Sequence, residues 1–282
     1  MALKFVFFLL QINNSQLIQL AITDVTASTY TFNEEFNVKR PMKLTNSFEF
    51  TSNSLVVNGG NGVDTISANI NNVYNLTISL QSLKQPAIHY NGEPHQYSFG
   101  GYTYYYSRTS MSVIGTLNNE NISGTAWFDR QYGDLARAIT KGWQWFAIEL
   151  ENNVQIMLFD FLGKNNEETE NESFGSITDE NGVTVDIKGH TNFTVVPINQ
   201  WTSPHTGCVY PSGWVVRVNG ESYTVIPDVL DQELYRTADM KKIIGLSPTY
   251  WEGKSTVFTA AGQEQAGKAY VELNGFCPKT PA

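Results

Sequence analysis

The fold is decided most clearly by residues 143–161, which read WQWFAIELENNVQIMLFDF. Two apolar runs flank a polar stretch of one glutamate and two asparagines at 151–153, a composition typical of a turn. Alternate side chains of an extended chain fall on one side, and the apolar ones in the first run are Phe146, Ile148 and Leu150. The stretch therefore predicts an antiparallel β-hairpin whose two strands are half buried.

Two further hairpins are predicted on the same grounds, because short apolar or alternating runs recur along the whole chain. One joins residues 3–12 to residues 17–25 around an asparagine-containing turn. The other joins residues 102–117 to residues 122–132 through the polar turn at 118–121. Helical patterns are scarce, so the sequence predicts an all-β class with very little helix.

The chain of 282 residues fits two domains of ordinary size better than one. Residues 134–141 predict a short helical connector, because Asp134 could cap it and Gly142 follows its end. We place the domain boundary there and expect domains at 1–135 and 136–282. Each is long enough for an eight-stranded antiparallel barrel or sandwich.

The composition excludes several classes of partner. A net charge of −9 offers no basic patch for nucleic acid or an anionic membrane, so we expect a small, weakly charged ligand. No apolar run approaches the ~20 residues that a membrane-spanning helix needs. The opening residues 1–10 are too short an apolar run for a secretory signal peptide, and we predict a strand there instead.

The residues most used in metal sites do not cluster in the sequence. Cys208 and Cys277 permit either one disulfide or two buried thiols, and no CxxC pair or suitably spaced histidine indicates a metal site. The histidines are predicted to have surface or hydrogen-bonding roles, and they are His89, His95, His190 and His205. The stretch 164–173, rich in asparagine and glutamate, is predicted to be a solvated loop without a functional role.

One carboxylate stands out, because Asp129 lies within an aromatic strand that runs into the domain boundary. The residues expected on one side of this strand are Trp127, Asp129 and Gln131, and those on the other are Phe128, Arg130 and Tyr132. Asp129 could face a cavity. It could equally form an ion pair across strands or stabilise a turn, and the pattern alone leaves both readings open.

Several segments together resemble the lipocalin-like family of carotenoid 1,2-hydratases (hydroxyneurosporene synthases) and AttH-like proteins. The segments are Tyr105-Tyr106-Ser107-Arg108, residues 124–133 (GTAWFDRQYG), residues 142–146 (GWQWF), Trp201-Thr202-Ser203-Pro204, Tyr210-Pro211, Asp231-Gln232-Glu233-Leu234, Tyr250-Trp251-Glu252-Gly253 and residues 270–276 (YVELNGF). The similarity therefore runs nearly end to end.

The chain also departs from the family pattern. Tyr132 takes the place of a tryptophan, Arg130 and Gln131 replace the His-Glu pair of other members, and Tyr104-Tyr105-Tyr106 stands where carotenoid hydratases have a His-Trp segment. An earlier Glu-Trp-Trp-Tyr strand of the family does not occur before Leu3. We therefore expect a first domain that is shortened at its N-terminus.

The resemblance implies a pair of lipocalin-like barrels with a ligand cavity near their junction. It also implies addition of water to an isolated carbon–carbon double bond of an isoprenoid or carotenoid-like ligand, with Asp129 as the general acid. A carboxyl that protonates an alkene must be kept neutral by burial. The ligand-binding residues it implies are Tyr105, Trp127, Arg130, Gln131, Tyr132, Trp143 and Trp145. No cofactor or metal is required, and the family places the protein outside the cytoplasm.

Two other functions remain open at this point. A pericyclase-like cyclase would hold a polyene in a reactive geometry within a shaped apolar cavity and would need no proton transfer. A non-catalytic lipocalin would only bind or carry a lipid. The three functions make different demands on Asp129, since only hydration requires its proton. The sequence predicts no oligomeric state.

Overall fold

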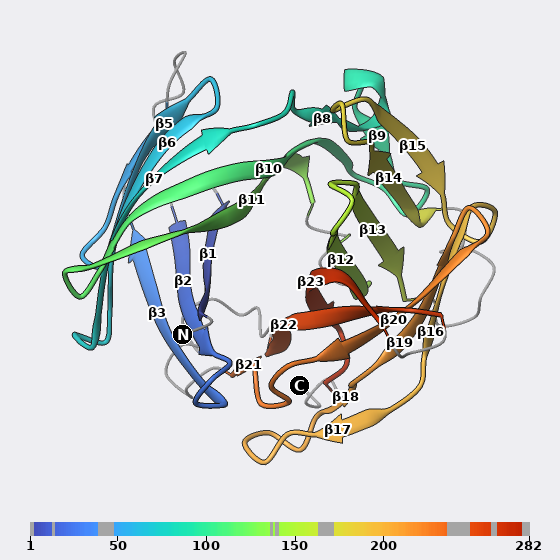
Figure 1. Ribbon diagram of the computed structural model, residues 1–282. Helices are drawn as coiled ribbons and strands as arrows, with labels where there is room; N and C mark the ends of the chain where they lie inside the picture. The colour runs from blue at the N-terminus through green and yellow to red at the C-terminus, as the bar shows by residue number, and fades with distance from the viewer. Residues whose placement is uncertain are drawn as a thin grey trace. The chain divides into compact units, whose positions relative to one another are not determined.

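The computed structural model describes residues 3–12, 15–38, 48–135, 138, 141–162, 172–235, 249–260 and 264–277. The described part contains 23 β-strands and few helical residues, and its neighbouring strands pair antiparallel (Figure 1). This confirms the all-β class with very little helix.

The chain divides into two compact units. The first unit comprises Met1–Pro86 and Arg108–Phe128, and the second comprises Ala87–Ser107 and Asp129–Ala282. Strands β10 (Tyr102–Leu117) and β11 (Glu120–Asp134) contribute residues to both units. The division into domains at residue 135 stays a prediction, because these units are defined by packing and not by independent folding.

The first unit is built from hairpins. Its remaining strands are β1 (Leu3–Ile12), β2 (Ser15–Asp24), β3 (Thr29–Val38), β4 (Phe48–Thr51), β5 (Leu55–Gly60), β6 (Val63–Ile70) and β7 (Tyr74–Ser82). Strands β1, β2 and β3 form a three-stranded sheet, and a second sheet has the order β11-β10-β7-β6-β5-β4. The predicted hairpin at the start of the chain is confirmed, since β1 pairs antiparallel with β2.

The core of the first unit follows the alternation of its strands. In β6 and β7 nearly every second residue is buried, which is the pattern of a sheet with one face in the core and one in water. The buried side chains include Ile18, Leu20, Ile66, Ile70, Leu76, Ile78 and Met111. Asp64 is the exception on this face, and it accepts a hydrogen bond of 3.0 Å from the Gly60 backbone N–H.

Asparagine-rich turns join these strands because asparagine tolerates the left-handed backbone region. The hairpin between β10 and β11 is confirmed, but its turn is shorter than predicted. Asn118 and Asn119 form it with φ of 49° and 69°, while Glu120 and Asn121 already belong to β11. Two residues with positive φ match the right-handed twist of the strands, so the ladder continues up to the turn.

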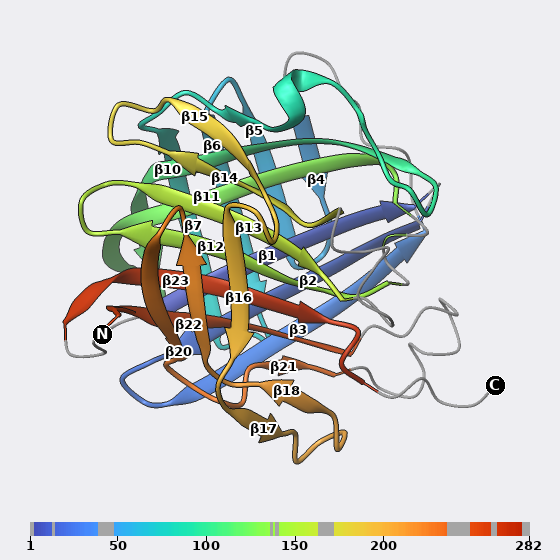
Figure 2. The same ribbon diagram turned by 90° about the vertical axis from the view of Figure 1, so that its right-hand side faces the viewer.

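The second unit contains one large curved sheet, which Figure 2 shows from a second side. The sheet has the order β15-β14-β13-β12-β23-β22-β20-β19-β16, with β21 on β22. Its strands are β12 (Trp143–Leu150), β13 (Gln155–Phe161), β14 (Phe174–Thr178), β15 (Thr184–Lys188), β16 (Phe193–Pro197), β19 (Trp214–Val218), β20 (Glu221–Pro227), β21 (Glu233–Leu234), β22 (Tyr250–Thr259) and β23 (Gln265–Asn274). The remaining short elements are β8 (Ala87–Ile88), the 3-10 turn His89–Gly92, β9 (His95–Gln96), β17 (Gln200–Thr202) and β18 (Val209–Pro211).

The deciding hairpin is confirmed as β12 and β13, but the expectation of half-buried strands is wrong. Phe146, Ile148 and Leu150 pack into the core of the unit as predicted. The opposite side of β12 is covered as well, and Trp145 and Ala147 are also buried. Strands covered on both sides read as continuous apolar runs, and the run of apolar residues from 156 to 159 fits this pattern.

The structure also bears on the predictions for the two cysteines, the connector and the solvated loop. Cys208 and Cys277 form a disulfide that closes a loop with a sequence separation of 69. Half of the predicted connector 134–141 lies outside the described residues, and Asp134, its predicted cap, is the last residue of β11. The prediction of a solvated loop at 164–173 is wrong for its last two residues, because Glu172 and Ser173 are buried and form hydrogen bonds within the unit. Residues 164–171 lie outside the described residues. No helix in the described ranges is both long and apolar enough to cross a membrane.

Candidate functional site

Asp129 lies on β11 beside β10, and a serine of β10 binds its carboxylate. The Ser107 hydroxyl donates a hydrogen bond of 2.5 Å to Asp129 Oδ1. Ser107 is fully buried, whereas Asp129 is partly exposed. Ser107 therefore orients the Asp129 carboxylate.

A histidine continues this chain of hydrogen bonds. His89 Nε2 lies 2.9 Å from Ser107 Oγ, and the imidazole is buried. His89 follows β8, which pairs with β10 so that Ala87 lies opposite Ser107. This pairing brings a residue from a separate segment of the chain next to the Asp129 strand.

The turn that carries His89 has an unusual backbone. Tyr90 and Asn91 both adopt the left-handed region, with φ of 56° and 55°, which is costly for a tyrosine. The Asp186 carboxylate accepts a hydrogen bond of 2.9 Å from the Tyr90 N–H, and its other oxygen lies 3.8 Å from His89 Nδ1. The Tyr90 ring stacks on the ring of His95 at 4.3 Å. These contacts hold His89 in place.

Aromatic side chains lie beside the same carboxylate. The Trp145 indole N–H donates a hydrogen bond of 3.1 Å to the Tyr105 hydroxyl, and both side chains are buried. The Tyr105 ring also lies 4.4 Å from the His89 ring. Burial, and then the negative charge of Asp129, raise the pKa of Tyr105 well above its ordinary value. Tyr105 is therefore neutral and can act as a hydrogen-bond donor.

The negative charge of Asp129 affects the pKa of a second carboxyl, that of Glu272 on β23. Removal from water, and to a smaller extent the charge of Asp129, raise the pKa of Glu272 to about 7, against a hydrogen bond of 3.1 Å from the Trp143 indole N–H, which lowers it. Glu252 lies directly opposite Glu272 in the β22–β23 ladder. With a pKa of about 7, Glu272 is partly protonated near neutral pH.

The other predicted residues divide between the two faces of β11. Gln131 shares a face with Asp129, and its amide N–H lies 3.5 Å from the Tyr97 hydroxyl. Tyr132 is on the opposite face, where it is half exposed, stacks on Tyr104 at 5.1 Å and lies beneath the Arg130 guanidinium. Trp127 belongs to the first unit. The ligand-binding roles of these residues stay predictions.

Three site residues were not identified as functional from the sequence. His89 was assigned a surface or hydrogen-bonding role, and Ser107 and Glu272 appeared only within segments that carry the family resemblance. His89 comes next to Asp129 through the pairing of β8 with β10, which no local pattern reports. Only Glu272 could have been noticed, because it is an acid on a strand within the resembling segment 270–276.

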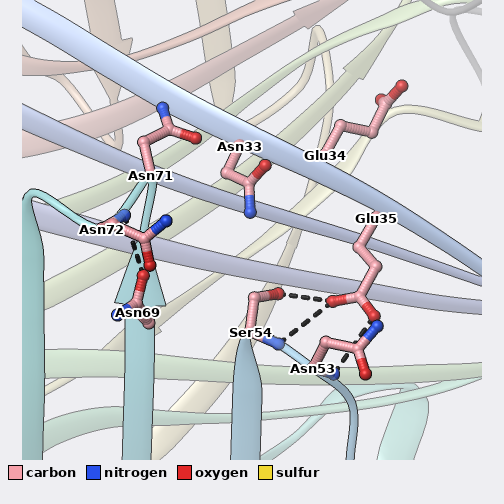
Figure 3. Close-up of a pocket in the computed structure, with 8 residues that line it drawn as sticks. All are labelled: Asn33, Glu34, Glu35, Asn53, Ser54, Asn69, Asn71 and Asn72. Carbon is pink, nitrogen blue, oxygen red and sulfur yellow. Dashed lines mark hydrogen bonds between the residues drawn. The ribbon is translucent and has the colours of Figure 1, made fainter.

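A groove in the first unit, shown in Figure 3, is a weaker candidate. It has a volume of about 440 Å³ and is lined by Asn33, Glu34, Glu35, Asn53, Ser54, Asn69, Asn71 and Asn72. Its polar groups hold turns: Glu35 accepts hydrogen bonds from the backbone N–H groups of Asn53 and Ser54. Asn71 donates one of 3.0 Å to the Phe32 carbonyl. These contacts account for the polar lining without a ligand.

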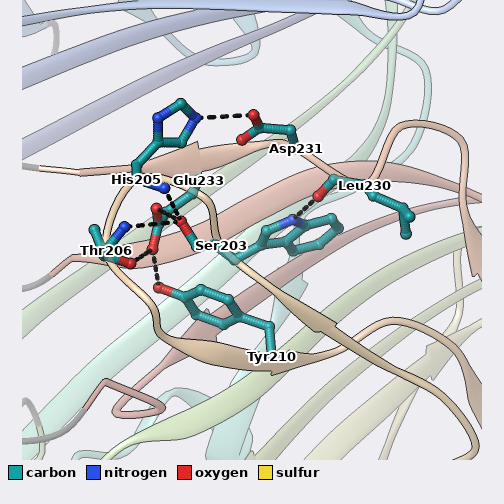
Figure 4. Close-up of polar contacts among 8 residues, drawn as sticks. Ser203, His205, Thr206, Tyr210, Leu230, Asp231 and Glu233 are labelled. Carbon is teal, nitrogen blue, oxygen red and sulfur yellow. Dashed lines mark hydrogen bonds and ion pairs between the residues drawn. The ribbon is translucent and has the colours of Figure 1, made fainter.

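A cluster around Glu233 in the second unit is also structural (Figure 4). Its buried carboxylate accepts hydrogen bonds from the hydroxyls of Ser203, Thr206 and Tyr210, the last two at 2.7 and 2.9 Å. Cys208 and Cys277 lie close enough to form a metal-ligand group with it. Their sulfur atoms form the disulfide, so neither can supply a thiolate.

With this geometry established, comparison with known proteins gives the family. A family model described as AttH-like matches residues 10–276. The chain belongs to the AttH-like family. This confirms the AttH-like part of the resemblance, whereas the narrower assignment to carotenoid 1,2-hydratases is not established by it. The sequence matches none of the curated proteins with which it was compared.

Solved structures share the fold of this AttH-like chain. A Nitrosomonas europaea protein described as a putative AttH is similar with a TM-score of 0.78 and 21% identity, over 97% of this chain and 86% of that one. Kievitone hydratase from Nectria haematococca is similar with a TM-score of 0.75 and 17% identity, over 98% and 84%. CghA, solved with Sch210972, has a TM-score of 0.51 and 6% identity over 99% and 89%. At these identities the likeness establishes the fold alone.

Proposed function

We propose that this AttH-like protein is a cofactor-independent hydratase that adds water to a carbon–carbon double bond of a hydrophobic unsaturated ligand. The observation that carries the proposal is the pair of carboxyls, Asp129 and Glu272, beside the buried aromatic side chains of Tyr105 and Trp145. Hydration of an alkene needs one group that gives a proton and one that takes a proton, and two carboxyls of unequal proton affinity can divide these roles.

Asp129 gives its proton to one alkene carbon, and the other carbon becomes a carbocation. The electron-rich faces of Tyr105, Trp143 and Trp145 stabilise this cation. A water molecule then adds through its oxygen and loses a proton to the Glu272 carboxylate. The alkene and one water become one alcohol, with no oxidation or reduction.

The charge coupling between the two acids assists the second step. Once Asp129 has lost its proton, its negative charge adds to burial, the larger cause, in raising the pKa of Glu272. Glu272 thus becomes a stronger base at the stage when the added water must lose a proton. Each acid has one ionisable neighbour: Glu252 lies opposite Glu272 in the ladder, and Tyr105 lies beside Asp129.

The ligand class is part of the proposal and rests on the family resemblance. An isoprenoid or carotenoid-like chain suits the buried aromatic side chains of Tyr105 and Trp145. We also propose a location outside the cytoplasm, which the disulfide between Cys208 and Cys277 supports, because disulfides persist mainly in oxidising compartments.

The test uses kievitone and neurosporene as probes and measures products that have gained the mass of one water. Replacing Asp129 with Asn is expected to lower the rate by at least about 100-fold, because general acid catalysis contributes roughly 10²–10⁴-fold. Binding of the probes, followed by native mass spectrometry, is expected to persist in the variant.

Other outcomes would replace the hydratase assignment. A bound but unchanged probe would indicate a lipid carrier, and an isomer without added water would indicate a cyclase. Hydration by Asp129→Asn at the native rate would show that the acid lies elsewhere. Circular dichroism of the variant distinguishes loss of catalysis from loss of fold.

A further inference from the structure

We propose that the Tyr90 hydroxyl binds an oxygen atom of the ligand, so that the site is built for an isoprenoid that carries an oxygen, such as an isoprenoid alcohol. This ligand class rests on the proposed hydratase function, because it concerns the ligand of the same site. Tyr90 lies in the 3-10 turn His89–Gly92 and belongs to the second unit, together with Tyr105 and Trp145.

The Tyr90 hydroxyl is a buried polar group that the protein leaves unpaired. Its oxygen is shielded from solvent and has no hydrogen-bond partner within the described ranges. The side chain as a whole keeps some exposure, so its hydroxyl end points into the unit. A buried hydroxyl without a partner destabilises the folded state, and phenylalanine would supply the same ring without that cost. The hydroxyl therefore needs a partner from outside the protein.

The neighbouring carboxylate is already engaged by other donors. Glu172 lies near enough to Tyr90 to affect the proton affinity of its hydroxyl. One Glu172 oxygen accepts a hydrogen bond of 2.6 Å from the Ser98 backbone N–H, and the other lies 3.0 Å from His95 Nε2. These bonds turn the carboxylate towards Ser98 and His95, and Tyr90 is left without an acceptor.

The backbone and the ring of Tyr90 are both held in place. Tyr90 adopts the left-handed region with φ of 56°, which residues other than glycine rarely do. Its ring stacks on that of His95 at 4.3 Å and packs against that of Phe174 at 4.6 Å, measured between ring centroids. Its N–H donates a hydrogen bond of 2.9 Å to Asp186. A ligand that meets so fixed a hydroxyl has little side-chain freedom to remove, which favours binding.

One aromatic ring separates Tyr90 from Tyr105 of the candidate site. The Phe174 ring lies 4.6 Å from the Tyr90 ring and 6.2 Å from the Tyr105 ring. Burial, and then the nearby Tyr97 and Tyr105 hydroxyl groups, raise the pKa of Tyr90 well above its ordinary value. The phenol is therefore neutral and can donate a hydrogen bond. A hydrocarbon chain beside these rings has no acceptor to offer, so only an oxygen of the ligand can pair with Tyr90.

Binding of two matched probes to the native protein and to Tyr90→Phe is the first test. The probes are farnesol, an isoprenoid alcohol, and deoxyfarnesol, in which hydrogen replaces the hydroxyl. Quenching of tryptophan fluorescence gives their dissociation constants without any turnover. Tyr90→Phe should weaken the binding of farnesol by at least about 5-fold and should change that of deoxyfarnesol by less than about twofold.

Tyr223→Phe is the matched control, because it removes the hydroxyl of another partly buried tyrosine, on β20 of the same unit. It should leave both dissociation constants unchanged. An equal loss for both probes in Tyr90→Phe would mean that the variant only disturbs the turn. No loss for either probe would mean that water alone satisfies the hydroxyl. Each of these two results would overturn the proposal.

The free energy of unfolding tests the unpaired state of the hydroxyl without any ligand. Because Tyr90 donates this hydroxyl to no described residue, Tyr90→Phe should keep or raise the midpoint of unfolding in urea. A lower midpoint would show that the hydroxyl is bonded within the protein, and the proposal would then be wrong.

Product analysis separates this proposal from the proposed function. If farnesol binds through Tyr90 but no probe gains a water, the hydratase assignment fails and the ligand contact stands. If the native protein hydrates both probes and Tyr90→Phe slows both equally with unchanged binding, the hydroxyl holds the reacting water. In that case the ligand contact fails and the hydratase assignment stands.

Discussion

The two units use the same kind of strand for different purposes. In the first unit the strands alternate between buried and exposed residues, and the buried face is almost wholly apolar. In the second unit β12 and β13 are buried on both sides, and the buried polar residues include His89, Ser107, Gln144, Glu172, Glu233 and Glu252. A sheet with one wet face can place its polar groups in water. A sheet covered on both faces has to satisfy them internally.

This difference explains where chemistry can arise. A titratable group on a wet face keeps its ordinary pKa, whereas one on a covered face is desolvated and responds to its neighbours. In the described part of the first unit such a group is Asp64: burial raises its pKa, and the Gly60 N–H and the Arg108 charge lower it. The second unit brings Asp129 and Glu272 within reach of each other's charge.

The largest expected effect is on the hydration rate, and it is tested by neutralising one buried acid in each unit. Glu272→Gln should lower hydration of kievitone or neurosporene by at least about 100-fold, because the added water loses its base. Asp64→Asn makes the same chemical change in the first unit and should leave the rate unchanged. Steady-state product analysis measures both. Equal losses would mean that the two units contribute alike to catalysis.

The next effect concerns the disulfide of the second unit. Replacing Cys208 and Cys277 together with serine should lower the free energy of unfolding by about 4 kcal/mol, the chain-entropy value for a loop of this length. Hydrogen exchange should show lost protection mainly in β22 and β23, with β6 and β7 protected as before. A uniform loss across both units would show that they unfold as one.

The smallest effect is a pH dependence of stability. The pKa of Glu272 is raised in the folded state from an ordinary 4.5 to about 7, so the stability it contributes is present below 4.5 and is lost as the pH rises through about 7. The slope in that window should be about 1.4 kcal/mol per pH unit at most. Glu272→Gln should flatten it, as urea titrations at several pH values would show. An unchanged slope would point to another group.

The sequence predicted those parts of the fold that local patterns encode. The hairpins around 151–153 and 118–121 follow from alternation and turn residues within about 30 positions. The full burial of β12 did not follow, because no pattern within a strand reports what covers its second face. The same local information led to the wrong expectation for Glu172, which is buried at the end of an otherwise polar stretch.

The candidate site was predictable only in part. Asp129, Trp143 and Trp145 stood out through a resembling motif in neighbouring strands. His89 did not, because its position depends on how β8 pairs with β10. The structure places the His89 imidazole against the ring of Tyr105. A neighbour that comes from another segment leaves no trace in a motif.

The left-handed backbone of Tyr90 and Asn91 limits which substitutions this turn can accept. A non-glycine residue in this region gives up roughly 1–2 kcal/mol of stability. Glycine at position 90 would relieve that strain, but it would also remove the ring that packs on His95 and Phe174 and free the turn that holds His89. The strained backbone and the placement of the imidazole therefore depend on the same side chain. Thermostabilised variants of this protein should be screened for turnover before this turn is relaxed.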